Sequence, residues 1–161
     1  MFDKFGEFDS SAEINEAAKG FLAEGDYKSL TEMAIENGLD QMDAEDYIDG
    51  VVPELCNELM AAVGKLEVEC KELQVKEIMR DWVEYIKAQC TENRAMAAAV
   101  RKKGKSLKGC IAALLAWSFQ NQIPVPVDVL KEAKVNAGRC TLGIPGMGQA
   151  KKIINEYYLG K

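Results

Sequence analysis

Three carboxylates between residues 77 and 84 come nearest, in type and spacing, to the acid/base pair of an enzyme. Glu77, Asp81 and Glu84 fall on one stripe of a predicted helix, and two carboxylates in different environments can act as general acid and general base. Cations stand three residues after Glu77 and Glu84, at Arg80 and Lys87. This pattern is typical of a solvated helix face with ion pairs, and we interpret the stripe in that way.

The histidine and cysteine content excludes the other usual catalytic and metal sites. The chain has no histidine, which removes the Ser-His-Asp and Cys-His arrangements that activate a nucleophile. The cysteines lie at least 14 residues apart and form no C-x-x-C pair, so zinc has no clustered thiolates to bind. We expect reduced cysteines that pack as small apolar residues, no metal, no cofactor and no enzymatic activity. The five are Cys56, Cys70, Cys90, Cys110 and Cys140.

An acidic run lies between residues 39 and 50, where a short helix is predicted from Asp43 to Gly50. Its carboxylates lack the D-x-[DN]-x-[DN]-G spacing and the terminal Glu of a calcium loop. Together with the preceding helix the run has a helix-turn-helix outline, but carboxylates in this position would be repelled by duplex DNA. We predict an acidic surface for a partner protein, formed by Asp40, Asp43, Glu45, Asp46 and Asp49.

A basic loop precedes an apolar segment in the second half of the chain. Ser106 is placed to cap the following helix, whose free N–H groups and positive dipole end would favour an anion. The loop is not a Walker phosphate loop, because Gly104-Lys105-Ser106 lacks the upstream Gly and the preceding strand. Phosphate or an acidic protein is the predicted ligand, and a solvated turn is the alternative. The predicted binding residues are Arg101, Lys102, Lys103, Lys105 and Lys108.

A glycine-rich segment near the C-terminus is similar to a helix-hairpin-helix element. In such elements Gly-apolar-Gly lets backbone N–H groups approach a DNA phosphate, and the lysines that follow add charge. Gly146 and Gly148 flank Met147 in this order, and Lys151 and Lys152 follow. The alternative interpretation is a plain Gly-Pro turn before a terminal helix.

The charge of the chain is divided by position. Residues 1–74 contain 19 acidic and 5 basic side chains, a net charge of −14, whereas residues 75–161 contain 7 acidic and 15 basic ones, a net charge of +8. Such asymmetry indicates binding surfaces of opposite sign. It predicts an acidic helical lobe over 1–74 and a basic helical lobe over 75–161, either as two lobes or within a single domain.

Hydrophobic periodicity and caps predict an all-α fold of about eight helices, in two packed layers or two small lobes. Ser10 and Glu13 form a predicted capping box, and Gly25 a predicted end for the first helix. Pro53 suits the first turn of a longer helix that reaches the charge boundary. The segment 123–127 must be extended, because its two prolines disfavour helical backbone before them.

The chain has no run of about 18 apolar residues, so no membrane-spanning helix is expected. Its N-terminal residues are charged and lack the apolar core of a signal peptide. We therefore expect a cytoplasmic protein that does not associate with membranes.

Two short motifs carry a resemblance to a known family. Lys105-Ser106-Leu107-Lys108-Gly109-Cys110 looks like an entry into a buried helix, and Glu156-Tyr157-Tyr158 like an aromatic terminal segment. From about Ala95 to Leu159 the layout resembles the PcfK-like proteins of Firmicutes plasmids and phages, a mobile-element group that includes type II-A anti-CRISPR proteins. The resemblance implies an inhibitor that occupies a surface of Cas9.

Four hypotheses follow. In the first, the acidic lobe imitates the charge of nucleic acid and occupies a basic channel such as that of Cas9. In the second, an accessory protein binds nucleic acid through residues 101–108 and 146–152. In the third, the protein is an enzyme, but its residues offer no base, nucleophile or metal cluster at suitable spacings. In the fourth, the acidic and basic lobes neutralise each other within one fold or across a dimer.

Overall fold

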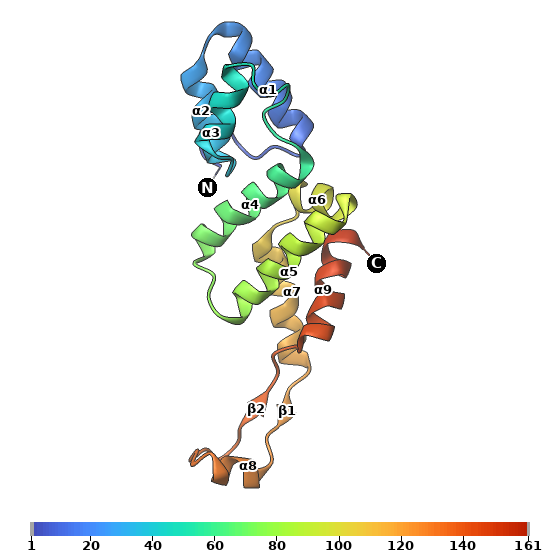
Figure 1. Ribbon diagram of the computed structural model, residues 1–161. Helices are drawn as coiled ribbons and strands as arrows, with labels where there is room; N and C mark the ends of the chain where they lie inside the picture. Colours follow the sequence, from blue (N-terminus) through green and yellow to red (C-terminus); the bar gives the residue numbers. More distant parts are fainter. Residues whose placement is uncertain (1, 161) are drawn as a thin grey trace.

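The computed structural model describes residues 2–160, and these residues form nine helices and one two-stranded antiparallel ribbon (Figure 1). The all-α prediction is therefore confirmed. The elements, in chain order, are α1 (Ser11–Glu24), α2 (Tyr27–Glu36), α3 (Gln41–Ile48), α4 (Glu58–Leu73), α5 (Ile78–Glu92), α6 (Arg94–Arg101), α7 (Leu107–Gln120), β1 (Ile123–Pro124), α8 (Val127–Glu132), β2 (Thr141–Leu142) and α9 (Met147–Leu159).

Local signals set the ends of the first helices. The Ser10 side chain accepts a hydrogen bond from the Glu13 N–H, and the Glu13 carboxylate accepts one from the N–H of Asp9 at 2.7 Å. This capping box begins α1, and Gly25, with a φ of 70°, ends it. The third helix begins earlier than predicted, because Asp40 rather than Asp43 caps it.

Helices α1–α3 form an N-terminal unit around a small apolar core. The apolar faces of α1 and α2 meet α3 and the segment that follows it, which buries side chains that include Ile14, Leu30, Met33, Tyr47 and Leu55. On α1 and α2 the buried apolar residues fall at helical spacing, Ile14 with Ala18 and Leu30 with Met33 and Ala34, so burial of one face holds the unit together.

The start predicted for the fourth helix at Pro53 is wrong, because α4 begins at Glu58. The buried side chain of Asn15 holds the backbone of Cys56 on both sides, donating to its carbonyl at 2.9 Å and accepting from its N–H at 3.1 Å. This pair of bonds keeps the segment before α4 out of the helical conformation. Asn57 then caps α4 by accepting from the N–H of Met60.

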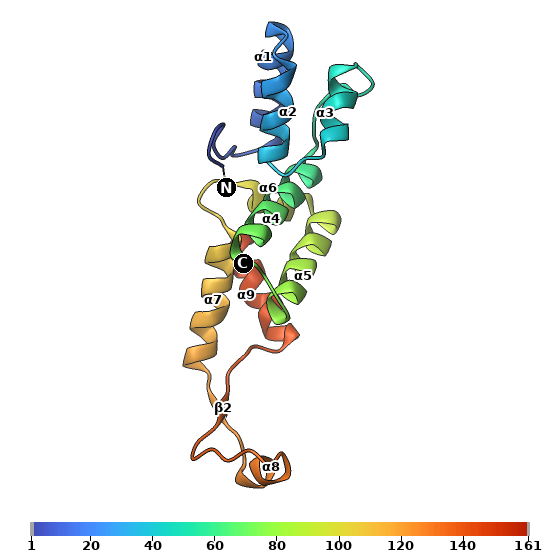
Figure 2. The same ribbon diagram turned by 90° about the vertical axis from the view of Figure 1, so that its left-hand side faces the viewer.

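Helices α4–α7 and α9 form the helical body, in which α6 packs between α4, α5 and α9 (Figures 1 and 2). Its core contains side chains such as Leu66, Trp82, Ile86, Leu114 and Ile154. Helix α4 supplies Ala61 to the first core and Ala62 to the second. The two apolar cores thus meet inside α4, whereas the charge of the sequence changes sign near residue 74; the predicted division at 74 stays a prediction.

Two glycines allow the N-terminal unit to pack directly on α4. A Cβ added at Gly38, which has a φ of 76°, would lie 2.1 Å from the carbonyl oxygen of Gly64. A Cβ added at Gly64 would lie 2.6 Å from the carbonyl oxygen of Asn37. Backbone therefore touches backbone where the α2–α3 turn crosses α4, and neither position has room for a side chain.

Residues 121–146 form an arm that projects from the body (Figure 1). Its two strands pair in the register Ile123 with Leu142 and Pro124 with Thr141, and α8 lies at its tip. The extended segment expected over 123–127 is present as β1 at its start, but the prediction is wrong at Val127, which is the first residue of α8. At the base, Gln122 donates to the Ser118 carbonyl and accepts from the Thr141 hydroxyl, which links the arm to the end of α7.

Candidate functional site

The predicted acidic surface lies on α3 and its cap. Asp40, Glu45 and Asp49 are exposed, whereas Asp43 and Asp46 are half-buried. Asp40 caps the helix, and Glu45 accepts a hydrogen bond from Gln41. Among residues 2–160, no ion pair joins any of these five carboxylates to a lysine or arginine. Their negative charge therefore faces solvent.

A shallow pocket extends this surface toward the start of α4. Asp43 and Asp46 line it together with Glu54, Cys56 and Asn57. Burial, opposed by the charge of Arg101 and assisted by those of Glu54 and Asp43, raises the pKa of the Cys56 thiol to about 12. The pocket thus holds carboxylates and a neutral thiol.

The N-terminal unit as a whole has the same sign as this surface. Residues 1–57 contain 15 acidic and 3 basic side chains, a net charge of −12. Lys4 and Lys28 both pair with Glu32, and the hydrogen bond from Lys4 lowers the pKa of that carboxyl. Within the described residues, no cluster of His, Cys, Asp and Glu is arranged to hold a metal ion.

Arg101, which the sequence places in a surface site for phosphate, lies in the interior. It is 1 % exposed and donates to the carbonyls of Phe8 at 3.0 Å and Ala61 at 3.3 Å, and to the side-chain oxygen of Asn37 at 2.5 Å. Burial lowers the pKa of its guanidinium. Arg101 therefore joins the N-terminal segment, the α2–α3 turn and α4, and its charge does not reach the surface.

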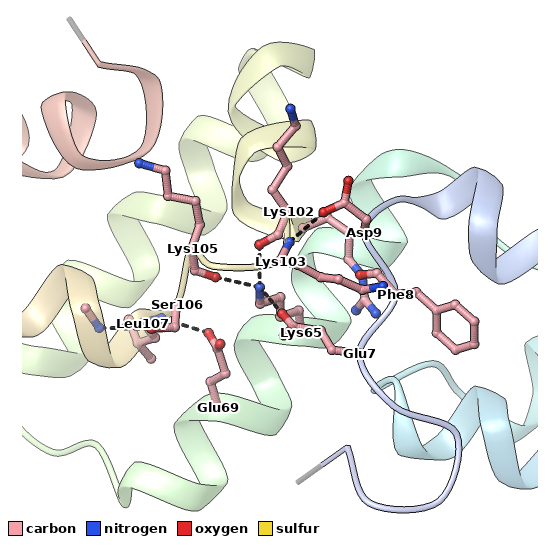
Figure 3. A network of polar contacts seen from close by, with 12 residues as sticks. Glu7, Phe8, Asp9, Lys65, Glu69, Lys102, Lys103, Lys105, Ser106 and Leu107 are labelled. Carbon is pink, nitrogen blue, oxygen red and sulfur yellow. Dashed lines mark hydrogen bonds and ion pairs between the residues drawn. The ribbon is translucent and has the colours of Figure 1, made fainter.

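Lys65 is a second buried cation at the same junction, and sequence reasoning missed it. Its side chain is fully buried, and Nζ contacts the Glu7 carboxylate at 2.5 Å and the carbonyl oxygens of Lys102 at 3.0 Å and Lys105 at 2.6 Å (Figure 3). The available signal was its place on the apolar face of α4, next to Leu66 and four residues before Glu69.

Glu69 lies one turn further along α4 and holds the start of α7. Its carboxylate accepts a hydrogen bond from the N–H of Leu107 at 2.9 Å (Figure 3). Burial raises the pKa of this carboxyl, and the bond from Leu107 and the charge of Lys65 oppose that shift. Glu69 thus occupies the helix end where the sequence predicts a phosphate.

The remaining cations of the basic loop are divided between contacts and solvent. Lys103 donates its N–H to Asp9 at 2.8 Å and pairs with Glu13 at 3.7 Å. Lys105 donates to the carbonyl of Tyr157 and lies over its ring, whereas Lys102 and Lys108 are exposed. Ion pairs between the acidic and the basic region are present, since Lys103 pairs with Glu13, Lys87 with Glu67 and Arg94 with Glu58. Lys65 belongs to the acidic region itself, and Arg101 donates to uncharged oxygens.

The two motifs that carry the family resemblance contact each other. The Tyr157 hydroxyl accepts a hydrogen bond from the N–H of Ser106 at 3.0 Å, and Ser106 caps α7 as predicted. A Cβ at Gly109 would lie 2.2 Å from that hydroxyl, so Gly109 leaves the space that Tyr157 fills. These residues join the start of α7 to the end of α9.

The glycine-rich segment is a turn before α9, because β2 and not a helix precedes it. Gly146, Gly148, Lys151 and Lys152 are exposed, and Lys151 lies over the ring of Tyr85. Lys105 contacts the opposite end of α9, which at about 1.5 Å per residue is roughly 20 Å long. The structure therefore separates the two predicted basic sites.

The stripe of carboxylates on α5 does not converge on one site. Glu77 and Asp81 line one shallow depression with Lys76 and Arg80, whereas Glu84 pairs with Lys87 in another. Cys56, Cys90 and Cys110 are buried as apolar residues would be, and burial raises the pKa of Cys90 and Cys110 to about 12. Cys70 and Cys140 are only half-buried, and all five thiols are free.

Comparison with family models, with curated proteins and with solved structures finds no match to this chain. Within residues 2–160, no helix has both the length and the apolar character needed to cross a membrane.

Proposed function

We propose that this chain is a non-enzymatic interaction protein whose acidic surface binds a basic groove of a nucleic-acid-binding protein, with the nucleic-acid channel of Cas9 as the specific candidate. The observation that carries the proposal is the charge of the N-terminal unit, where exposed carboxylates on α3 form no ion pair with a lysine or arginine in residues 2–160. The resemblance to PcfK-like proteins, and through them to inhibitors encoded by phages and mobile elements, supports the same partner.

Electrostatics explains why such a surface would compete with nucleic acid. A channel that holds a guide–target heteroduplex through lysines and arginines recognises charge and backbone shape rather than sequence. A field of clustered carboxylates attracts the same cations and speeds encounter. Because the cations Arg101, Lys65 and Lys103 are turned toward the junction, they do not screen the far side of the N-terminal unit.

Binding to guide-loaded Cas9 tests this proposal. The test variant replaces Asp40 and Asp49 by Asn and Glu45 by Gln, which keeps the size of each side chain and, at Asp40, a residue that can cap α3. We expect affinity to fall roughly tenfold, the combined effect of three weak ion pairs, and to weaken further with added salt.

A matched control removes three exposed carboxylates outside the N-terminal unit, as Glu72→Gln, Glu92→Gln and Glu156→Gln. The control has the same net charge as the test variant, so equal losses of affinity would mean that only overall charge matters. Absence of both binding and inhibition at about 50 mM salt would refute Cas9 as the partner.

The alternative function is that of a nucleic-acid-binding accessory protein. One observation favours it, namely that Lys102, Lys108, Lys151 and Lys152 are exposed. A mobility-shift assay with single- and double-stranded DNA and RNA at about 50 mM salt tests it. If it is correct, replacing these four lysines by glutamine abolishes the shift and flattens the dependence of affinity on salt.

A further inference from the structure

The arm exposes apolar side chains that residues 2–160 leave uncovered. From Phe119 to Ile144, all of which the structure describes, no residue is buried. Exposed large apolar side chains run from the end of α7 through the tip to the return strand: Leu115, Phe119, Ile123, Val127, Val129, Val135, Leu142, Ile144 and Met147. This property is independent of the acidic surface, which lies at the other end of the molecule (Figure 1).

The register of the ribbon gathers part of this surface onto one face. Ile123 and Leu142 are directly opposite in the antiparallel pair and each is 67 % exposed. Opposite residues of an antiparallel ribbon point to the same side, so the two form one apolar patch. At the base, Leu115 and Phe119 are four residues apart on α7 and thus share a helix face.

The exposed area matches what a stable interface needs. A half-exposed aliphatic side chain presents on the order of 100 Å², so the nine together present on the order of 900 Å², summed over all faces of the arm and its base. Each partner in a standard interface contributes about 800 Å². A two-stranded ribbon without a core of its own is marginal in water, and both of its outer edges are free to pair.

We propose that the arm binds the arm of a second copy of this chain, in a two-fold symmetric dimer. The arm is nearly neutral, with two acidic and three basic side chains in residues 121–146, so apolar contact rather than charge selects its partner. Antiparallel alignment places the tip of each arm, with Val127 and Val129, against the base of the other, with Leu115 and Phe119. Each apolar end then meets an apolar end, as a two-fold interface requires.

Sedimentation velocity of the full chain, from about 1 µM to about 1 mM, tests this dimer. The test variant, Ile123→Ser with Leu142→Ser, removes the central patch, and we expect the dimer dissociation constant to rise at least about a hundredfold. The matched control, Ile35→Ser with Met42→Ser, removes two side chains of similar exposure from the N-terminal unit and should leave the constant unchanged.

Circular dichroism and thermal unfolding establish that both variants fold, which the exposure of all four side chains leads us to expect. A second arm variant, Val127→Ser with Val129→Ser at the tip, should also weaken the dimer, because α8 has no buried residue that the change could disturb. A wild-type chain that stays monomeric throughout would overturn the proposal and leave a foreign apolar partner as the occupant. A dimer that both arm variants leave intact would overturn it as well.

Discussion

Replacing Lys65 by methionine should destabilise the fold strongly, although no predicted binding residue changes. Methionine fills a similar volume but leaves the Glu7 carboxylate and the carbonyls of Lys102 and Lys105 without their donor. Removing one partner of a buried ion pair costs about 3–5 kcal/mol. Water can reach Glu7, whose side chain is 31 % exposed, so we take the low end, about 3 kcal/mol. For a chain of this size that corresponds to a fall in Tm of about 6–12 °C.

Urea unfolding at neutral pH measures this loss, with Lys102→Met as the control because Lys102 is exposed beside the same loop. We expect the control to change the free energy of unfolding by less than about 0.5 kcal/mol. Two probes follow the unfolding. Tryptophan fluorescence reports the helical body, which contains both Trp82 and Trp117, and far-UV circular dichroism reports every helix.

The two probes should shift to lower urea together, because α4 supplies residues to both apolar cores. A loss below about 1 kcal/mol, or one no larger than that of the control, would refute the argument that Lys65 holds the junction together.

Three further predictions concern the same packing. Gly64→Ala should destabilise the chain by about 1–3 kcal/mol in urea unfolding, since its Cβ would lie 2.6 Å from the carbonyl oxygen of Asn37. The control, Gly20→Ala on an open helix face, should stabilise the chain by up to about 1 kcal/mol. Gly109→Ala should be destabilising alone but much less so with Tyr157→Phe, which removes the clashing hydroxyl; additive losses in the double-mutant cycle would contradict this. Burial raises the pKa of Glu69, so its protonated form is favoured by folding and stability is lost as pH rises through that pKa. Glu69→Gln should therefore be more stable than wild type at neutral pH, with a gain that shrinks on acidification. A difference in the free energy of unfolding that stays constant as the pH falls from neutrality to the ordinary pKa of a glutamate, about 4.3, would refute this.

The helices were predictable because their caps are local. Ser10, Gly25 and Ser106 act within four residues of themselves, and the structure uses all three as expected. The failure at Pro53 has the opposite origin, since the backbone of Cys56 is held by a side chain 41 residues earlier in the chain. Such a contact cannot be predicted from hydrophobic periodicity or from neighbouring residues in the sequence.

The basic loop shows the same limit for the candidate site. Its charges are evident in the sequence, but their direction depends on contacts with residues as far as 94 positions away, such as that between Lys103 and Asp9. A lysine or arginine is the same residue type whether it is exposed or buried, and only the packing of the fold decides which it is. Arg101, which is central to the predicted anion site, is for this reason one of the most deeply buried side chains of the chain.

The acidic surface and the apolar arm lie at opposite ends of the molecule, and this separation has a consequence for binding. A dimer joined through its arms holds two N-terminal units, each with a net charge of −12, pointing away from the shared arm region. A partner with two basic sites, or a densely charged surface, would then meet a bivalent ligand whose second contact is intramolecular.

Loss of the dimer through Ile123→Ser with Leu142→Ser should consequently reduce apparent affinity for such a partner while leaving affinity for a single immobilised site unchanged. The same two substitutions therefore distinguish an arm that serves self-association from one that contacts the partner directly, because direct contact would weaken both measurements equally.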